Sequence, residues 1–277
     1  MIRLAIPAHT AGDVFAKCIS GKIEPQRKAR LEGLQAAIEV GDVTYHGLAQ
    51  SAQLFKMPDE ILPEGVDLTE VAGVYTQRFV PEKSLGRDIY EDLILAPDNR
   101  TCPLCGIGFV ESLDHYLPKH FWKFIVSPKN LVPSCLHCNK VKLEHSPASF
   151  GDQTIHPYYD DFQSHTWLCA TVIEKVPPSV TYEVVNLEHW DDQNMMRART
   201  HFTKHGLAAL FTSNAGNELS ENKKRFQDLY QKCGPKGVRD HLVSELKYLP
   251  LKNDWKTALY KALSESDWFC HEDCLLI

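Results

Sequence analysis

The sequence predicts an α+β protein that is mainly helical and carries a compact cysteine-rich module near its middle. Apolar residues recur at helical spacing through residues 1–97, and most of residues 164–277 shows the same pattern. Between them, residues 98–163 are rich in turn residues and contain two C-x-x-C pairs and five histidines. We therefore expect three regions: a helical N-terminal region (1–97), a central module (98–163) and a C-terminal α+β region that is mostly helical (164–277).

The N-terminal region predicts a series of helices. Pro25 stands where a first-turn proline belongs, and apolar residues from Leu31 to Ile38 follow at helical spacing until Gly41, which should end the helix. Further apolar runs predict helices around residues 47–55, 71–79 and 89–94. The expected role of this region is packing, because nothing in its sequence demands chemistry.

The C-terminal region predicts a hairpin followed by helices. Segments 168–174 and 180–186 are rich in apolar and β-branched residues, and Pro177-Pro178 between them indicates a turn. In the helical stretch that follows, Ser220 is a suitable N-cap, and Gly234-Pro235 should break the helix.

The overall composition excludes several classes of protein. The chain has 277 residues, of which 43% are hydrophobic and 24% charged, values that are typical of globular proteins rather than of disordered or fibrous ones. No apolar run approaches the roughly 20 residues of a membrane span, and the N-terminus lacks a secretory signal. We expect a cytoplasmic protein without a membrane partner. The formal net charge of -6 means that any phosphate binding must be local.

The cysteines point to a metal rather than to disulfides. The chain has nine cysteines, an odd number, and no signal peptide, which argues against a disulfide framework. Two C-x-x-C pairs, Cys102 with Cys105 and Cys135 with Cys138, would together complete a tetrahedral site for Zn²⁺. A closed site of four thiolates is structural rather than catalytic. A thioredoxin-like redox site would need one such pair in a βαβ context, which is absent here.

Residues between and after the cysteine pairs resemble a known family. The Asp114-His115 pair, Asn130, and Asn139 directly after the last cysteine are similar to the signature of the HNH, or ββα-metal, endonucleases. The resemblance covers about 60 residues, roughly a fifth of the chain. It implies a ββα-metal fold for the central module. It also implies His115 as the general base, Asp114 and Asn139 as ligands of a catalytic Mg²⁺ or Mn²⁺, and Asn130 as the residue that orients the base.

The residue types fit the chemistry of phosphodiester hydrolysis. A neutral imidazole can deprotonate water near pH 7, and a hard cation can stabilise the charge that develops on the phosphate. Oxygen ligands suit Mg²⁺ or Mn²⁺ whereas thiolates suit Zn²⁺, so ligand softness would keep the two metals apart.

Other residues of the module are weaker candidates. Lys119, Lys140 and Lys142 are candidate nucleic-acid contacts. Three histidines, His120, His145 and His156, are possible accessory residues, with plain structural roles as the alternative. Residues 99–145 contain six basic and three acidic residues, whereas the rest of the chain contains 24 and 33, so the positive patch is thin.

We therefore expect a metal-dependent HNH endonuclease that cleaves DNA. The resemblance extends to HNH proteins of bacterial phage-defence and restriction loci, often encoded beside an ATPase, so a protein partner such as an ATPase is expected. A ribonuclease with the same residues is an alternative, because the phosphate chemistry is shared. A non-catalytic, zinc-bound interaction module of a defence complex is another.

Overall fold

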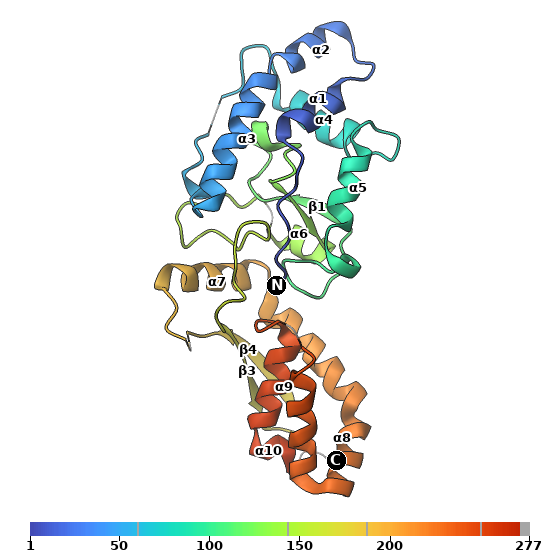
Figure 1. Ribbon diagram of the computed structural model, residues 1–277, viewed down its shortest axis with the longest axis vertical. Coiled ribbons are helices and arrows are strands. Elements are labelled where there is room, and N and C mark those ends of the chain that lie inside the picture. Colours follow the sequence, from blue (N-terminus) through green and yellow to red (C-terminus); the bar gives the residue numbers. More distant parts are fainter. Residues whose placement is uncertain (60, 143, 187, 250, 272–277) are drawn as a thin grey trace. The chain divides into compact units, whose positions relative to one another are not determined.

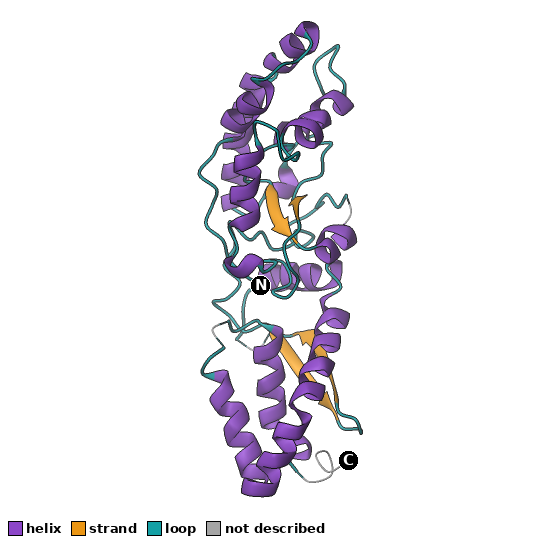
Figure 2. Cartoon of the chain, turned by 90° about the vertical axis from the view of Figure 1, so that its right-hand side faces the viewer, coloured by secondary structure: helices purple, strands orange, loops and turns teal. Residues whose placement is uncertain are grey.

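The computed structural model describes residues 1–277 except 60, 143, 187, 250 and 272–277. The chain forms two compact units, which we call the N-terminal unit (Ile2–Asp161) and the C-terminal unit (Met1 and Phe162–Ile277). Both are built mainly from helices, and each contains one antiparallel pair of strands in the described residues (Figures 1 and 2). The predicted α+β, mainly helical fold class is therefore confirmed at this level.

The N-terminal unit begins with five helices and continues into the cysteine-rich module, as the labels in Figure 1 show. Its helices are α1 (Ala11–Ile19), α2 (Pro25–Glu32), α3 (Gln35–Gln50), α4 (Leu68–Arg78), α5 (Arg87–Leu95) and α6 (Leu136–Lys142). Its 3-10 turns are η1 (Leu54–Lys56), η2 (Asp98–Arg100) and η3 (Trp122–Phe124), and its strands are β1 (Ser112–His115) and β2 (Leu131–Ser134).

Helix α3 corrects one sequence prediction. The helix predicted from Pro25 to Gly41 is divided at Gly33 and Leu34 into α2 and α3. Helix α3 does not end at Gly41 but runs through it to Gln50, so it also includes the start of the helix expected at 47–55. A Cβ atom at position 41 would lie 2.9 Å from Cδ of Lys123, next to η3. Gly41 therefore allows close packing of α3 against η3. A glycine inside a helix costs only about 1 kcal/mol relative to alanine, which packing on this scale offsets.

Strands β1 and β2 form the centre of the cysteine-rich module. They are antiparallel, with Ser112 opposite Ser134 and His115 opposite Leu131, and α6 follows β2 after a single residue. Both strands are almost wholly buried. Aromatic side chains pack around this module: Tyr45 of α3 lies 5.1 Å from Phe124 of η3 between ring centroids, and the Tyr158 hydroxyl donates to the backbone oxygen of Leu131 in β2 at 2.9 Å. The strands and α6 thus hold the central polar residues of the sequence at fixed positions.

The C-terminal unit contains the predicted hairpin, with β3 (Leu168–Ile173) paired to β4 (Ser179–Val184), followed by α7 (Asp192–Lys204), α8 (Leu207–Leu246), α9 (Trp255–Glu265) and α10 (Asp267–Cys270). Figure 2 shows this hairpin as a pair of orange arrows packed with helices. Ser220 lies inside α8 and is not an N-cap, because the helix already begins at Leu207 after the left-handed Gly206. The predicted break at Gly234-Pro235 is confirmed, since Gly234 has φ 65°.

No helix in the described part of the chain combines the length and apolarity that a membrane crossing requires.

Candidate metal centre and candidate active site

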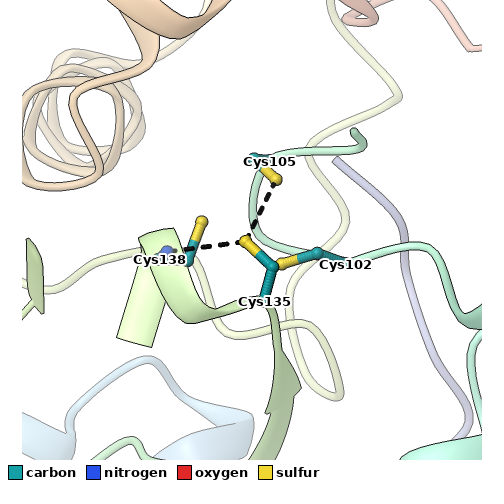
Figure 3. A group of neighbouring side chains, drawn as sticks. All are labelled: Cys102, Cys105, Cys135 and Cys138. Atoms are coloured by element: carbon teal, nitrogen blue, oxygen red, sulfur yellow. Dashed lines mark hydrogen bonds between the residues drawn. The ribbon is translucent and has the colours of Figure 1, made fainter. Parts of the chain in front are cut away.

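The four predicted cysteines form one buried cluster. Their sulfur atoms all lie within 4.8 Å of one another, and Figure 3 shows them directed toward a common centre. The Sγ atoms of Cys105 and Cys135 are 3.9 Å apart, too far for a disulfide bond. Tetrahedral ligands at the usual Zn–S distance would be separated by about 3.8 Å. The cluster therefore fits a structural metal such as zinc.

Glycines and backbone amides shape the two cysteine loops. Gly106 has φ 73°, a conformation that favours glycine, and it closes the first loop. A Cβ at Gly108 would lie 2.6 Å from Sγ of Cys135, so only glycine fits there. The N–H groups of Gly108 and Cys138 donate to the sulfurs of Cys105 and Cys135, at 3.3 and 3.5 Å. These bonds favour the thiolate form that a metal requires.

Three of the four HNH-like residues line one pocket. The pocket is open to solvent, has a volume of about 460 Å³, and includes Asp114, His115 and Asn139 in its lining. The remaining lining residues are Tyr75, Thr76, Val80, Tyr90, Ser112, Leu113, Pro118, Lys119 and Glu144. The fold therefore brings together three of the polar residues that the sequence singled out.

His115 is held in one protonation state. Its Nε2 lies 2.9 Å from the carbonyl oxygen of Ile125. A carbonyl only accepts, so Nε2 carries the proton and the neutral ring keeps Nδ1 as its basic atom. Burial lowers the pKa of His115 to about 3, with Lys119 and Lys142 acting in the same direction and the Ile125 carbonyl against it. The imidazole is therefore neutral at physiological pH.

Asp114 is paired with a buried lysine. Nζ of Lys142 lies 3.3 Å from Oδ2 of Asp114 and donates to the backbone oxygen of His115 at 2.6 Å. Both side chains are less than a tenth exposed. Burial raises the pKa of Asp114, whereas Lys142 acts in the opposite direction. Lys142 thus supplies the positive charge that compensates a buried carboxylate, and its ammonium group is not on the surface where we expected a nucleic-acid contact.

Asn130 fixes the loop that carries Ile125. Its side chain is fully buried and makes three hydrogen bonds to backbone. Oδ1 accepts from N–H of Leu117 at 2.7 Å, while Nδ2 donates to the oxygens of Leu117 and Phe124 at 3.0 and 3.3 Å. The loop between β1 and β2 is thereby closed on itself next to Ile125, whose carbonyl sets the tautomer of His115.

Asn139 lines the pocket and contacts the first residue of β1. Its Nδ2 donates to Oγ of Ser112 at 2.8 Å. Asn139 is half-buried at the pocket, one residue after the zinc-cluster Cys138 on α6.

The other predicted basic residues differ in their surroundings. Lys119 is exposed, lines the pocket, and has its Nζ 5.3 Å from the ring centre of Tyr75. Lys140 is exposed on α6, outside the pocket lining. Lys129 is paired with the buried Asp42 at 2.5 Å. Two lysines of the module, Lys129 and Lys142, therefore have their charge neutralised inside the protein.

The three accessory histidines lie outside the pocket lining. His120 is exposed and lies 3.6 Å from Asp59, while Nε2 of His145 contacts the backbone oxygen of Asp152 at 3.0 Å. His156 is buried, stacks on Tyr116 with ring centres 4.3 Å apart, and contacts the hydroxyl of Tyr45 at 3.1 Å. These contacts indicate structural roles, and for His156 a role in the aromatic core.

Part of the pocket comes from helices to which the sequence assigned no chemistry. Tyr75 and Thr76 of α4, Val80 just after it, and Tyr90 of α5 form one wall. Their apolar spacing predicted the helices correctly, but spacing alone does not show which buried side chains face a polar site. The Tyr75 ring lies 4.7 Å from the His115 ring, so this wall touches the candidate base directly.

Comparison with known proteins gives one informative match. The chain is 26% identical over 293 residues to protein ea31 of Escherichia phage lambda, covering 97% of this chain and 99% of that protein. No family model matches the sequence. No solved structure matches it significantly. The sequence similarity to the phage protein covers the residues of both units and is not confined to the cysteine-rich module.

Proposed function

We propose that this protein is a metal-dependent HNH endonuclease that hydrolyses phosphodiester bonds of DNA. The observation that carries the proposal is a single pocket in which a neutral imidazole of fixed tautomer lies beside the side-chain oxygens of Asp114 and Asn139. The order β1, β2, α6 supports the same reading, because it matches the ββα arrangement that the resemblance implies. A role in phage defence or restriction remains a prediction from that resemblance.

The donor set of the pocket fits a hard divalent cation. A carboxylate from Asp114 and an amide oxygen from Asn139 are the ligands that Mg²⁺ or Mn²⁺ would use here, with water completing the coordination. When bound, such a cation stabilises the charge of the phosphate and of the leaving oxygen. Lys142 already neutralises Asp114, so a cation could bind this carboxylate only if the Lys142 ammonium group moved away from one of its oxygens.

The protein's own residues supply the remaining chemistry. Nδ1 of His115 accepts a proton from the attacking water, because the Ile125 carbonyl reserves Nε2 as a donor. Asn130 keeps that carbonyl in position through the loop. Lys119, exposed at the pocket, is the cation best placed to hold a substrate phosphate.

The distribution of charge supports dependence on a partner. With Lys129 and Lys142 paired to buried carboxylates, fewer basic residues of the module are left to contact phosphates. We infer that a protein partner, such as the ATPase suggested by the resemblance, directs this nuclease to its target.

A cleavage assay tests the proposal. Purified protein should nick plasmid DNA with Mg²⁺ or Mn²⁺, and folded, zinc-loaded His115→Ala should be slower by about 10²- to 10⁴-fold. His120→Ala is the matched control, because this exposed histidine five residues away lies outside the pocket lining. Equal cleavage by the wild type and His115→Ala would refute the assigned base. Cleavage of RNA but not of DNA would favour the ribonuclease alternative.

A further inference from the structure

Tyr75 makes three contacts around the candidate base, although it lies on α4, well outside the HNH-like residues. Its ring is inclined 65° to that of His115, with the ring centres 4.7 Å apart. Its hydroxyl donates to the backbone oxygen of Leu113 at 3.2 Å. Nζ of Lys119 lies over the same ring, 5.3 Å from its centre. One side chain therefore contacts the base, the strand on which the base lies, and the exposed lysine of the pocket.

The geometry restricts rotation of the imidazole. The hydrogen bond from Nε2 to Ile125 fixes one edge of the His115 ring but still allows the ring to rotate about that bond. The Tyr75 ring packs edge-to-face against the imidazole and restricts this rotation. Leu113 lies two residues before His115 on β1, so the hydrogen bond from the Tyr75 hydroxyl to the Leu113 carbonyl ties Tyr75 to the strand that carries the imidazole.

Tyr75 is itself immobile. It is 8% exposed and packs against Phe79, with ring centres 5.9 Å apart. Phe79 in turn packs against Tyr90 of α5. Burial raises the pKa of Tyr75, so its hydroxyl stays protonated, and that proton is donated to Leu113. Tyr75 is therefore not placed to act as an acid or base.

We propose that Tyr75 is a positioning residue for the reaction, holding the imidazole of His115 and the ammonium group of Lys119 in their working orientation. The proposal rests on the proposed nuclease function and adds a requirement to it: the active site is completed by a helix of the N-terminal region. A misplacement of about 1 Å in a catalytic group can cost roughly 100-fold in rate. Loss of the Tyr75 ring should therefore affect the chemical step.

The test compares three variants of the full-length protein in the plasmid-nicking assay. Tyr75→Leu removes the ring and should lower kcat by about 10- to 100-fold, with a smaller rise in KM because Lys119 loses its contact with the ring. Tyr75→Phe keeps the ring and loses only the bond to Leu113, so it should restore most of the rate. Tyr182→Leu removes a similarly buried ring from the C-terminal unit, outside the pocket lining, and should lose far less than Tyr75→Leu.

A measurement independent of cleavage accompanies the assay. In NMR spectra, the Nε2–H signal of His115 should be sharp and slow to exchange in the wild type and Tyr75→Phe, and broadened or lost in Tyr75→Leu. Wild-type cleavage by a folded, zinc-loaded Tyr75→Leu protein would overturn the proposal, as would equal losses in Tyr75→Phe and Tyr75→Leu. If no protein cleaves nucleic acid, the proposed function fails, and the NMR comparison still decides whether Tyr75 positions His115.

Discussion

The sulfur cluster and the oxygen-lined pocket are adjacent, yet they are built in opposite ways. Cys138 belongs to the cluster and Asn139, the next residue of α6, to the pocket. The cluster is buried and its four thiols complete a tetrahedral set, so no position remains for a substrate. The pocket opens to solvent and its oxygen donors are fewer than a hard cation uses, so it leaves room for water and phosphate. Closure suits a site that stabilises structure, and openness suits a site that reacts.

The largest effect should come from breaking the cluster. Cys135→Ser removes a ligand at the junction of β2 and α6, and a structural zinc contributes about 10 kcal/mol or more of apparent folding free energy. The variant should lose zinc and unfold locally or aggregate. Elemental analysis and circular dichroism would measure this. Cys233→Ser, at an exposed cysteine outside the cluster, is the control. If purified wild-type protein contained no bound metal, the assignment of a zinc site would be contradicted.

A smaller effect is expected from breaking the ion pair in the pocket. Lys142→Met leaves Asp114 buried without its compensating charge, which should cost about 3 to 5 kcal/mol of unfolding free energy. Added Mg²⁺ or Mn²⁺ should restore more stability to this variant than to the wild type, because the cation replaces the ammonium group. Thermal melts with and without metal would test this, with the exposed Lys140→Met as control. Equal metal dependence in both variants would show that Asp114 does not bind the cation.

A pH-dependent effect should follow from the neutral His115. Its pKa is about 3 in the folded protein and about 6.5 when unfolded, so acidification protonates the unfolded state first. Stability should therefore fall as the pH drops below about 6.5, by roughly 2 kcal/mol between pH 7 and pH 5. The raised pKa of Asp114 opposes this trend at lower pH.

Urea unfolding of the wild type and His115→Asn, without added Mg²⁺ or Mn²⁺, would isolate the histidine contribution. The variant should show a flatter pH dependence, since it lacks the group that titrates. Parallel curves would mean that His115 is protonated equally in both states.

The smallest effect concerns DNA binding by the isolated protein. With only a few exposed basic residues near the pocket, about two phosphates would be neutralised, which gives a salt slope near -2 on logarithmic axes. Binding measured across a salt series should be weak and shallow. Lys119→Ala should reduce the slope by about one, and Lys129→Ala should leave it unchanged, because Lys129 is already paired with Asp42. A steep slope would argue against the need for a partner.

The sequence was sufficient for features that depend on local spacing. Two C-x-x-C pairs identify the cluster because each pair forms its own loop, and the Asp114-His115 pair lies on a strand whose partner follows within 20 residues. It was insufficient where distant elements meet. The contact of Tyr75 with His115 depends on how α4 packs on β1, and the burial of Lys142 depends on its position facing Asp114. The prediction that Gly41 ends a helix was wrong, because the glycine is required by close contact with Lys123, which lies outside its own helix.

The three hydrogen bonds of Asn130 also have a kinetic meaning. They close a loop of about a dozen residues between Leu117 and Asn130. Two of the bonds join the Asn130 side chain to the backbone of Leu117, and the third joins it to the carbonyl oxygen of Phe124, next to Ile125. The Leu117 N–H can exchange with solvent only when its hydrogen bond to the Asn130 side chain breaks, so its protection from hydrogen exchange reports how often the loop opens. Each opening also releases the carbonyl that fixes the His115 tautomer. The lifetime of these three hydrogen bonds thus sets how long His115 keeps its tautomer between openings.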